Sequence, residues 1–351
     1  MEGGKSGNPA LQAGLIHLYL NNHSCEKGIE KMLRAFFIYL SKATWARQIV
    51  THWRVAWQAA SRFVAGEKLE DGIAVVKRLN NNGIQATLDQ LGEHTTNAED
   101  AEKATQGILQ ILDAIETEAV RSNVSIKLTQ IGLKVDLSLC TENLARILEH
   151  ARKRNNFVRI DMEDASCVDD TLALFYEMRN GRGFHNVGLV IQSYLYRTVE
   201  DVTRLMQIPA RIRLCKGAYK EAVHIAYPKK RDVDANYDRV AQILLERALE
   251  VGAPELSEDG RVPPIPALAT HDEKRIRFAI EHANQIGLPK KAMEFQMLYG
   301  IRRDLQVSLV EQGYPVRVYV PFGSEWYPYF TRRLAERPAN VWFFISNYFK
   351  K

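Results

Sequence analysis

The chain has 351 residues, of which 46% are hydrophobic and 25% are charged, so it can bury one large α/β barrel or the cores of two ordinary domains. Its net charge of +5 is too small to indicate nucleic-acid binding, because acidic residues are interspersed throughout, but it is compatible with loose contact to an anionic membrane surface. The cysteines Cys25, Cys140, Cys167 and Cys215 show neither metal-ligand spacing nor a CxxC pair, which predicts a reduced, cytoplasmic protein without a metal site.

The first 66 residues predict a tail followed by a helical arm. Residues 11–20 form the most apolar early run, but this run is too short to span a bilayer and lacks the order of a signal peptide. Apolar and aromatic residues then recur at helical spacing across residues 26–64. We expect this arm to pack on the main domain or on a partner chain, which is compatible with a homo-oligomer. A membrane-facing role is the less favoured alternative.

From residue 67 to residue 351, short apolar segments alternate with longer helical ones. This regular alternation predicts a parallel sheet, and about eight units match a closed (βα)8 barrel of the TIM type better than an open sheet. The predicted strands are residues 85–88, 125–128, 157–160, 187–191, 212–215, 267–269, 294–296 and 316–320. The predicted helices are residues 98–121, 141–152, 167–179, 199–206, 235–251, 273–286, 302–312 and 327–336.

Every predicted strand carries a polar residue at or near its end, and the active site of such a barrel lies at the carboxyl ends of its strands. A strand-end Asp161 or Thr270 is more often a helix cap, and Lys127 with Glu93 can form a structural ion pair. Lys127 and Arg213, however, lie within apolar strands, where a buried cation needs a charged or ligand partner. Polar residues at the ends of all eight strands are better explained by a shared pocket than by unrelated helix caps. The residues concerned are Asp89, Glu93, Lys127, Thr129, Asp161, Glu163, Gln192, Arg213, Lys216, Thr270, His271, Glu294, Gln296 and Tyr319.

Two adjacent arginines, Arg332 and Arg333, lie in the last predicted helix. Positions three and four apart share a helix face, so Tyr329 lies beside both arginines and Glu336 lies near them. A carboxylate suits two neighbouring guanidinium groups, because arginine binds it through two parallel hydrogen bonds. A solvated basic surface explains most isolated pairs, but the polar strand ends favour a site for a small zwitterion.

A second, larger ligand would use five of the strand-end residues. No GxGxxG or P-loop motif is present, so a Rossmann-type cofactor domain is not expected. Gly217, followed by Ala218, would let the backbone approach a phosphate or a ring closely. The five residues are Gln192, Arg213, Lys216, Thr270 and His271.

The strand-end segments resemble those of the proline dehydrogenase family in order and spacing. The resemblance runs from about Ile84 to Glu336 and covers all eight strands, and it is closest to the single-function bacterial form. The segments that carry it are Leu91-Gly92-Glu93, Ser125-Ile126-Lys127-Leu128-Thr129, Arg159-Ile160-Asp161-Met162-Glu163-Asp164, Gln192-Ser193-Tyr194, Arg213-Leu214-Cys215-Lys216-Gly217-Ala218-Tyr219, Ala269-Thr270-His271, Glu294-Phe295-Gln296, and Tyr319 with Arg332, Arg333 and Glu336.

The resemblance implies a distorted (βα)8 barrel whose eighth helix sits over the barrel mouth, with FAD bound noncovalently at the carboxyl ends of the strands. It implies oxidation of L-proline to Δ1-pyrroline-5-carboxylate and transfer of the electrons to a membrane quinone. The enzyme would then be cytoplasmic, with peripheral contact to the inner face of the cell membrane.

The resemblance also implies a role for each matching residue. Lys127, Asp161, Arg213 and Tyr319 would be catalytic, with Arg213 near the reactive flavin nitrogen. The substrate site would comprise Arg332 and Arg333 at the proline carboxylate, Tyr319, Tyr329 and Leu298 around its ring, and Lys127 paired with Glu93. The flavin contacts would be Asp161, Met162, Gln192, Arg213, Lys216, Gly217, Ala218, Thr270, His271 and Glu336.

Two other functional classes compete with this interpretation. One is a barrel lyase or aldolase in which Lys127 forms a Schiff base, and bound flavin would distinguish the two classes. The other is a non-catalytic binding module that uses the helical arm, which leaves the polar strand ends unexplained.

Overall fold

The computed structural model describes residues 57–58, 60–92 and 95–336. The chain divides into two compact units, one of residues 1–61 with 325–351 and the other of residues 62–324. Most of the predicted helical arm lies outside the described residues.

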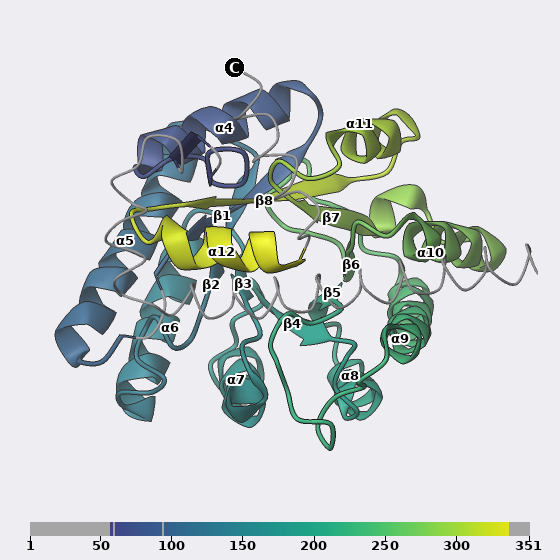
Figure 1. The fold of residues 1–351 in the computed structure, drawn as a ribbon, viewed down its shortest axis with the longest axis horizontal. Coiled ribbons are helices and arrows are strands. Elements are labelled where there is room, and N and C mark those ends of the chain that lie inside the picture. The colour runs from purple at the N-terminus through teal and green to yellow at the C-terminus, as the bar shows by residue number, and fades with distance from the viewer. Residues whose placement is uncertain (1–56, 59, 93–94, 337–351) are drawn as a thin grey trace, which may run out of the picture. The chain divides into compact units, whose positions relative to one another are not determined.

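Residues 62–324 contain a closed barrel of eight parallel strands, which confirms the predicted fold class (Figure 1). The strands follow one another around the barrel in chain order, and the last strand closes it by pairing with the first, with Gln85 opposite Arg317 and Thr87 opposite Tyr319. The strands are β1 (Gln85–Gln90), β2 (Ser122–Ile126), β3 (Val158–Ile160), β4 (Val187–Gln192), β5 (Arg211–Cys215), β6 (Pro266–Ala269), β7 (Glu294–Leu298) and β8 (Val316–Phe322).

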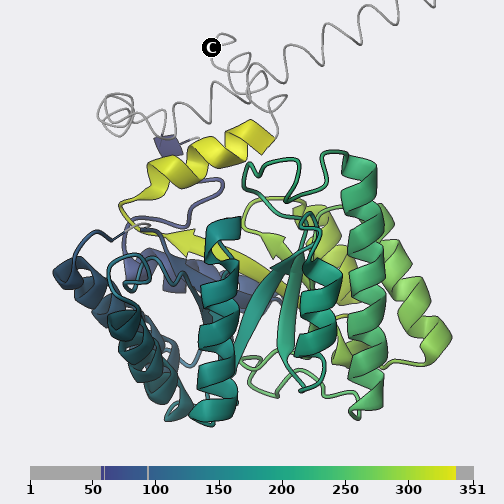
Figure 2. The ribbon, with the colours of Figure 1, turned by 90° about the horizontal axis from the view of Figure 1, so that it is seen from below.

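Helices surround the outer face of this barrel (Figures 1 and 2). Several begin at a side-chain cap, as where Asn97 accepts a hydrogen bond from the Asp100 N–H and Asp136 accepts one from the Leu139 N–H. The helices of this unit are α4 (Leu69–Asn81), α5 (Ala98–Thr117), α6 (Leu137–Arg152), α7 (Val168–Tyr176), α8 (Thr198–Leu205), α9 (Lys230–Glu250), α10 (Glu273–Ile286) and α11 (Arg303–Glu311).

Helix α4 precedes β1 and packs against both β1 and β8, where the last helix of a regular barrel would lie. This helix is not among those predicted from the sequence. Its buried residues Gly72, Ile73, Val75 and Val76 form one apolar face. The helix that follows β8, α12 (Trp326–Glu336), belongs to the other unit, where the Trp326 ring meets the Trp57 ring edge to face with centroids 5.3 Å apart. It matches the predicted helix at residues 327–336.

The inside of the barrel is polar, although most barrels of this type fill it with branched aliphatic residues. Outward positions are apolar, as with Leu88, Val124 and Leu214, which belong to the hydrophobic core. Hydrogen bonds from Arg213 on β5 to Ser125 on β2 and to Gln296 on β7 cross the barrel and place these side chains inside it. Charged and amide side chains therefore fill the barrel interior, and they must hydrogen-bond with one another.

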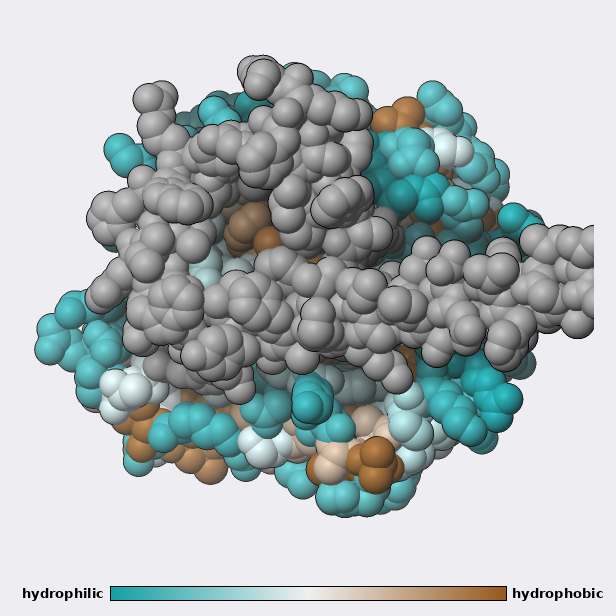
Figure 3. Space-filling model, viewed as in Figure 1, coloured by the Kyte–Doolittle hydropathy of each residue, from teal (hydrophilic) through white to brown (hydrophobic). Residues whose placement is uncertain are grey.

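The surface of the described part is mainly hydrophilic on the face shown in Figure 3, and its apolar residues form small separate patches. No helix among the described residues has the length and apolar character needed to cross a membrane.

Candidate active site

Arg213 is the centre of a buried cluster at the carboxyl ends of the strands. Its Nη1 lies 2.7 Å from Asp161 Oδ1 and 3.0 Å from Ser125 Oγ, and its Nε donates to Gln296 Oε1 at 2.5 Å. Ser125 in turn donates to the same Asp161 oxygen at 2.8 Å. Arg213 is 6% exposed, and these contacts compensate its buried charge.

Tyr319 joins this cluster from β8. Its hydroxyl donates to Asp161 Oδ2 at 2.7 Å, and its ring centroid lies 5.4 Å from the guanidinium carbon of Arg213. Burial raises the pKa of Tyr319 well above its usual value, and the nearby carboxylates of Asp161 and Asp89 act in the same direction. The phenol is therefore a neutral donor that holds the Asp161 carboxylate in place.

Lys127 follows β2 directly, because the strand ends at Ile126, two residues earlier than predicted. Its Nζ lies 3.0 and 3.1 Å from the two carboxylate oxygens of Asp89, 3.5 Å from Tyr319 Oη and 3.9 Å from Asp161 Oδ2. Burial raises the pKa of Asp89, whereas the positive charge of Lys127 lowers it. The structure thus brings Lys127, Asp161, Arg213 and Tyr319 into one connected group.

Asp89 is a member of this group for which the sequence predicts no role. It is 1% exposed and stands at the end of β1, so its position as a buried acid at a strand end was the available signal. The predicted pair between Lys127 and Glu93 lies outside the described residues.

Gln192 lies at the end of β4 and has an unsatisfied buried atom. Its Nε2 donates to the backbone carbonyls of Met162 at 3.4 Å and Glu163 at 3.2 Å, whereas its Oε1 is buried without a hydrogen-bond partner. A buried acceptor of this kind suits a ligand that carries an N–H group.

Lys216 and Gly217 lie just after β5. Lys216 Nζ lies 2.6 Å from Asp234 and 2.7 Å from Asp272, so two carboxylates hold it at the rim. Gly217 has a φ of 108°, and an added Cβ would lie 2.3 Å from the Tyr194 ring. Glycine is therefore required at this turn, and Ala218 follows it.

Thr270, His271 and Leu298 form a second contact region, after β6 and at the end of β7. The backbone N–H of Leu298 donates to His271 Nε2 at 3.0 Å, which places the proton of the neutral imidazole on Nδ1. Thr270 Oγ1 accepts a hydrogen bond from the Asp272 N–H at 3.1 Å, and Asp272 caps α10. His271, a predicted flavin contact, thus accepts a hydrogen bond from Leu298, a predicted substrate contact.

The remaining predicted substrate residues lie on α12. The guanidinium carbon of Arg333 lies 5.2 Å from the centroid of the Tyr329 ring, so these two residues share a helix face. Arg332 precedes Arg333 on the same helix. The side chain of Glu336 lies outside the described residues.

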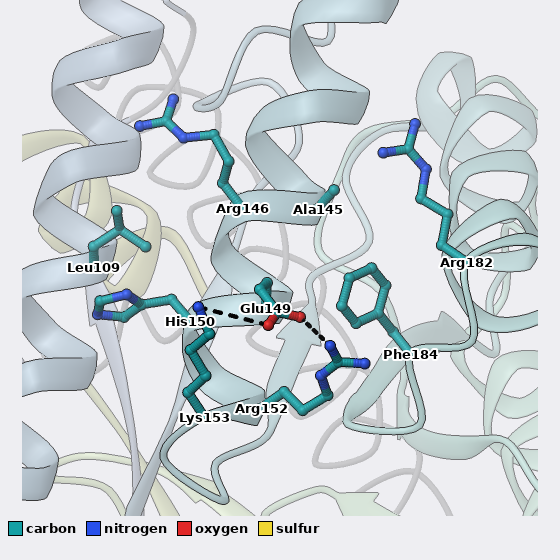
Figure 4. Close-up of a pocket in the computed structure, with 9 residues that line it drawn as sticks. All are labelled: Leu109, Ala145, Arg146, Glu149, His150, Arg152, Lys153, Arg182 and Phe184. Carbon is teal, nitrogen blue, oxygen red and sulfur yellow. Dashed lines mark ion pairs between the residues drawn. The ribbon is translucent and has the colours of Figure 1, made fainter.

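A hollow of about 500 Å3 on the outside of the barrel is unrelated to these strand ends. Figure 4 shows it between α5, α6 and the segment before β4. Its cations are already paired, as where Arg152 and Lys153 lie 2.5 and 3.7 Å from Glu149. These side chains are 56% and 68% exposed, and solvent-exposed charge that is already balanced gives little reason to bind a further anion.

The closed barrel and the buried charged cluster at its strand ends define a (βα)8-barrel enzyme. Residues 73–345 match the family model described as proline dehydrogenase, so the chain belongs to the proline dehydrogenase family. It is 39% identical to proline dehydrogenase 2 of Bacillus subtilis over 91% of this chain and 99% of that protein, and 40% identical to proline dehydrogenase of Deinococcus radiodurans over 84% and 91%.

A solved structure supports the fold independently. The crystal structure of proline utilization A from Bdellovibrio bacteriovorus inactivated by N-propargylglycine matches with a TM-score of 0.74 and 25% identity. The match covers 88% of this chain but 37% of the other. The chain is therefore similar to the single-function relatives along nearly their whole length and to one part of the larger protein.

The predicted family and activity are confirmed. The enzyme oxidises proline to Δ1-pyrroline-5-carboxylate, the first step of proline catabolism, and its family is flavin-dependent.

Proposed function

We propose that the chain oxidises L-proline with FAD bound noncovalently at the carboxyl ends of the strands. The observation that carries this proposal is the connected group of Lys127, Asp89, Asp161, Tyr319 and Arg213. It combines two buried cations with two buried carboxylates in one strand-end region, which suits a zwitterion held beside a ring that gains negative charge on reduction.

The residues present fit a flavin. The unpartnered Oε1 of Gln192 can accept a hydrogen bond from a ring N–H, and Thr270 and His271 carry polar groups at the same barrel end. Arg213 and Lys216 supply positive charge for a ring edge and a phosphate. We also propose contacts from Met162, Gly217, Ala218 and Glu336. When bound, the flavin accepts the hydride that leaves the proline carbon next to nitrogen.

The chain's own residues position the substrate and stabilise charge. Arg332 and Arg333 bind the proline carboxylate, and Tyr319, Tyr329 and Leu298 surround its ring. Lys127, Glu93 and Asp161 are the charged residues that line the substrate pocket. Arg213 stabilises negative charge that develops on the cofactor side, because a fixed cation in a site without water acts strongly on nearby charge.

We further propose that the electrons pass to a membrane quinone and that the enzyme is cytoplasmic, with peripheral contact to the inner face of the cell membrane. Support comes from the family and from the net charge of +5, which suits an anionic surface.

A visible spectrum under anaerobic conditions tests the proposal. The purified protein should be yellow, and L-proline alone should bleach its flavin absorbance. Denaturation should then release FAD into solution, because the cofactor is not covalently attached. A colourless protein that binds FAD neither when purified nor when mixed with it would contradict the proposal, as would release of FMN in place of FAD.

A further inference from the structure

Below the strand-end cluster, the barrel interior holds a second group of polar side chains to which the proposed function gives no role. It comprises Glu294 and Gln296 on β7 and Arg317 on β8, which are 0%, 4% and 0% exposed. Glu294 and Arg317 are fully buried, and the Gln296 amide is engaged by Glu294 and Arg213. We therefore expect their effect on the reaction to pass through Arg213.

Arg317 fixes the position of Glu294. Its Nε lies 3.0 Å from each carboxylate oxygen of Glu294, while Nη1 donates to the Ala86 carbonyl at 2.7 Å and Nη2 to the Gly260 carbonyl at 2.8 Å. All three nitrogens are engaged, so the planar guanidinium has one orientation. Glu294 is therefore an anchored acceptor in the barrel interior.

Gln296 links this anchor to Arg213. Its Nε2 donates to Glu294 Oε1 at 2.5 Å, and its Oε1 accepts from Arg213 Nε at 2.5 Å. A carboxylate paired with arginine only accepts hydrogen bonds. Rotating the amide by 180° would therefore turn its oxygen toward Glu294 and its NH2 group toward the guanidinium. Glu294 thus selects the orientation in which the carbonyl oxygen of Gln296 faces Arg213.

The guanidinium of Arg213 is consequently held from two sides. Gln296 holds Nε, while Asp161 and Ser125 hold Nη1. We propose that Glu294 and Gln296 are positioning residues, which aim Arg213 through a hydrogen-bonded path that begins at Arg317. This proposal rests on the proposed role of Arg213 beside the flavin.

Gln296→Met tests the path, because methionine keeps the length of the side chain but removes both hydrogen bonds. We expect kcat to fall about tenfold or more with little change in the KM for proline, since a hydrogen bond to a charged group is lost at a point that does not contact substrate. We also expect the reduction potential of the bound flavin to become more negative, because a displaced cation stabilises the reduced form less well.

Thr87→Val is the matched control. Thr87 Oγ1 lies 2.6 Å from Asn123 Oδ1 in the same barrel interior, and both residues are 1% exposed. This substitution removes a buried hydrogen bond without touching the path to Arg213. It should lower the Tm while leaving kcat and the flavin potential unchanged.

Glu294→Gln provides a second variant in case Gln296→Met does not fold. It keeps the shape of the side chain but removes the acceptor-only partner, so that the Gln296 amide can take either orientation. We expect the same loss of kcat and the same direction of potential shift, with a smaller size.

Arg213→Lys separates the two proposals. If this variant has the kcat and potential of the wild type, the role proposed for Arg213 is wrong. If it changes both while Gln296→Met and Glu294→Gln change only the Tm, the positioning proposal is overturned. In an Arg213→Lys background we expect Gln296→Met to cause no further change in potential, because the Nε contact is already gone. A full additional shift there would also overturn the proposal.

Discussion

Tyr319 makes two kinds of contact in one side chain. Its hydroxyl donates to Asp161, whereas its ring lies beside the guanidinium of Arg213. The hydroxyl can therefore be removed separately from the ring, which allows the electrostatic and steric roles of this residue to be tested apart.

We predict that the enzyme prefers L-proline to trans-4-hydroxy-L-proline and that Tyr319→Ser narrows this preference, mostly by weakening proline. The physical reason is the cost of placing an unpaired hydroxyl against an aromatic wall, about 1–3 kcal/mol in protein interiors. Tyr319→Phe is the control, because it retains the ring and should retain the preference. The ratio of kcat/KM for the two substrates decides the matter. The same ratio in Tyr319→Ser, accompanied by a lower Tm, would show that the ring only fills space.

Arg332→Met and Arg333→Met should each raise the KM for proline about tenfold or more while the flavin stays bound. The expected loss is that of a charge-assisted hydrogen bond, about 1.5–3 kcal/mol. Arg231→Met on α9 is a suitable control, because the Arg231 side chain is 78% exposed and its Nε lies 3.2 Å from the neighbouring Asp232. Steady-state kinetics over a range of proline concentrations provides the measurement. If both variants had the wild-type KM for proline, the proposal that Arg332 and Arg333 bind its carboxylate would be wrong.

At the level of single residues, the sequence located polar groups but not their partners. Lys127 and Arg213 could be recognised as buried cations because each lies in or directly after an apolar strand. That Lys127 contacts Asp89 and that Arg213 contacts Gln296 depends on the register of strands far apart in the chain. One sequence without its fold does not contain that information.

At the level of elements, the strong hydrophobic pattern made the eight strands predictable. The clearest shift is in β2, which begins at Ser122 and not at Ser125, because Asn123 faces the barrel interior and pairs with Thr87. Its polarity was typical of a turn, although its side chain is buried. The predicted helix at residues 167–179 proved to be a 3-10 turn, α7 and a π-helical turn at Glu177–Gly181. Periodicity alone does not distinguish these helical forms.

Gly188 in β4 offers a test of how tightly the barrel is packed. An added Cβ would lie 2.3 Å from the Arg211 carbonyl oxygen, 2.6 Å from the Phe157 ring and 2.8 Å from Arg159 Nη1. The oxygen belongs to the paired strand β5, so it cannot move without disturbing the sheet. We predict that Gly188→Ala destabilises the protein by about 1–3 kcal/mol.

Gly181→Ala is the matched control for this prediction, because the nearest atom to its added Cβ outside the local backbone is a Glu177 side-chain carbon at 3.8 Å. Urea unfolding of both variants gives the comparison. Equal stability of the two variants would mean that the barrel relaxes around the new methyl group, contrary to the rigid packing inferred here.

At the scale of the whole molecule, ionic contacts join elements that are distant in sequence. Lys216 after β5 contacts Asp234 on α9 and Asp272 after β6, and Arg275 on α10 lies 2.7 Å from Asp238 on α9. The ion pairs of Lys216 and of Arg275 connect the loops at the strand ends to the helices outside. The charge states of these residues should therefore affect the stability of the whole barrel.

Asp238 should make the protein less stable as the pH rises from 4.5 to 7.5. Burial is the main cause that raises the pKa of Asp238 to about 6, although the charge of Arg275 opposes it. The unfolded value is about 3.9, so the folded protein holds a proton that the unfolded chain releases. The bound proton therefore stabilises the folded protein fully when the pH is below the pKa of Asp238 in the unfolded chain. This stabilisation is lost as the pH rises through the pKa of Asp238 in the folded protein. Asp238→Asn should remove this dependence, which we expect to be about 1 kcal/mol because the site is partly screened by solvent.

Asp272→Asn supplies the contrast for this measurement. Burial acts to raise the pKa of Asp272, but the hydrogen bonds and charge of Lys216 with the Lys274 N–H outweigh it and lower the pKa to about 2. Its stabilisation is therefore present above the unfolded pKa of about 3.9 and is lost only as the pH falls toward 2, so it stays constant between pH 4.5 and 7.5. Urea unfolding of wild type and both variants at the two pH values gives the result. The opposite result would be a free energy of unfolding that increases with pH in the wild type relative to Asp238→Asn. Asp238 would then be a stabilising anion, and the interpretation of its burial would be wrong.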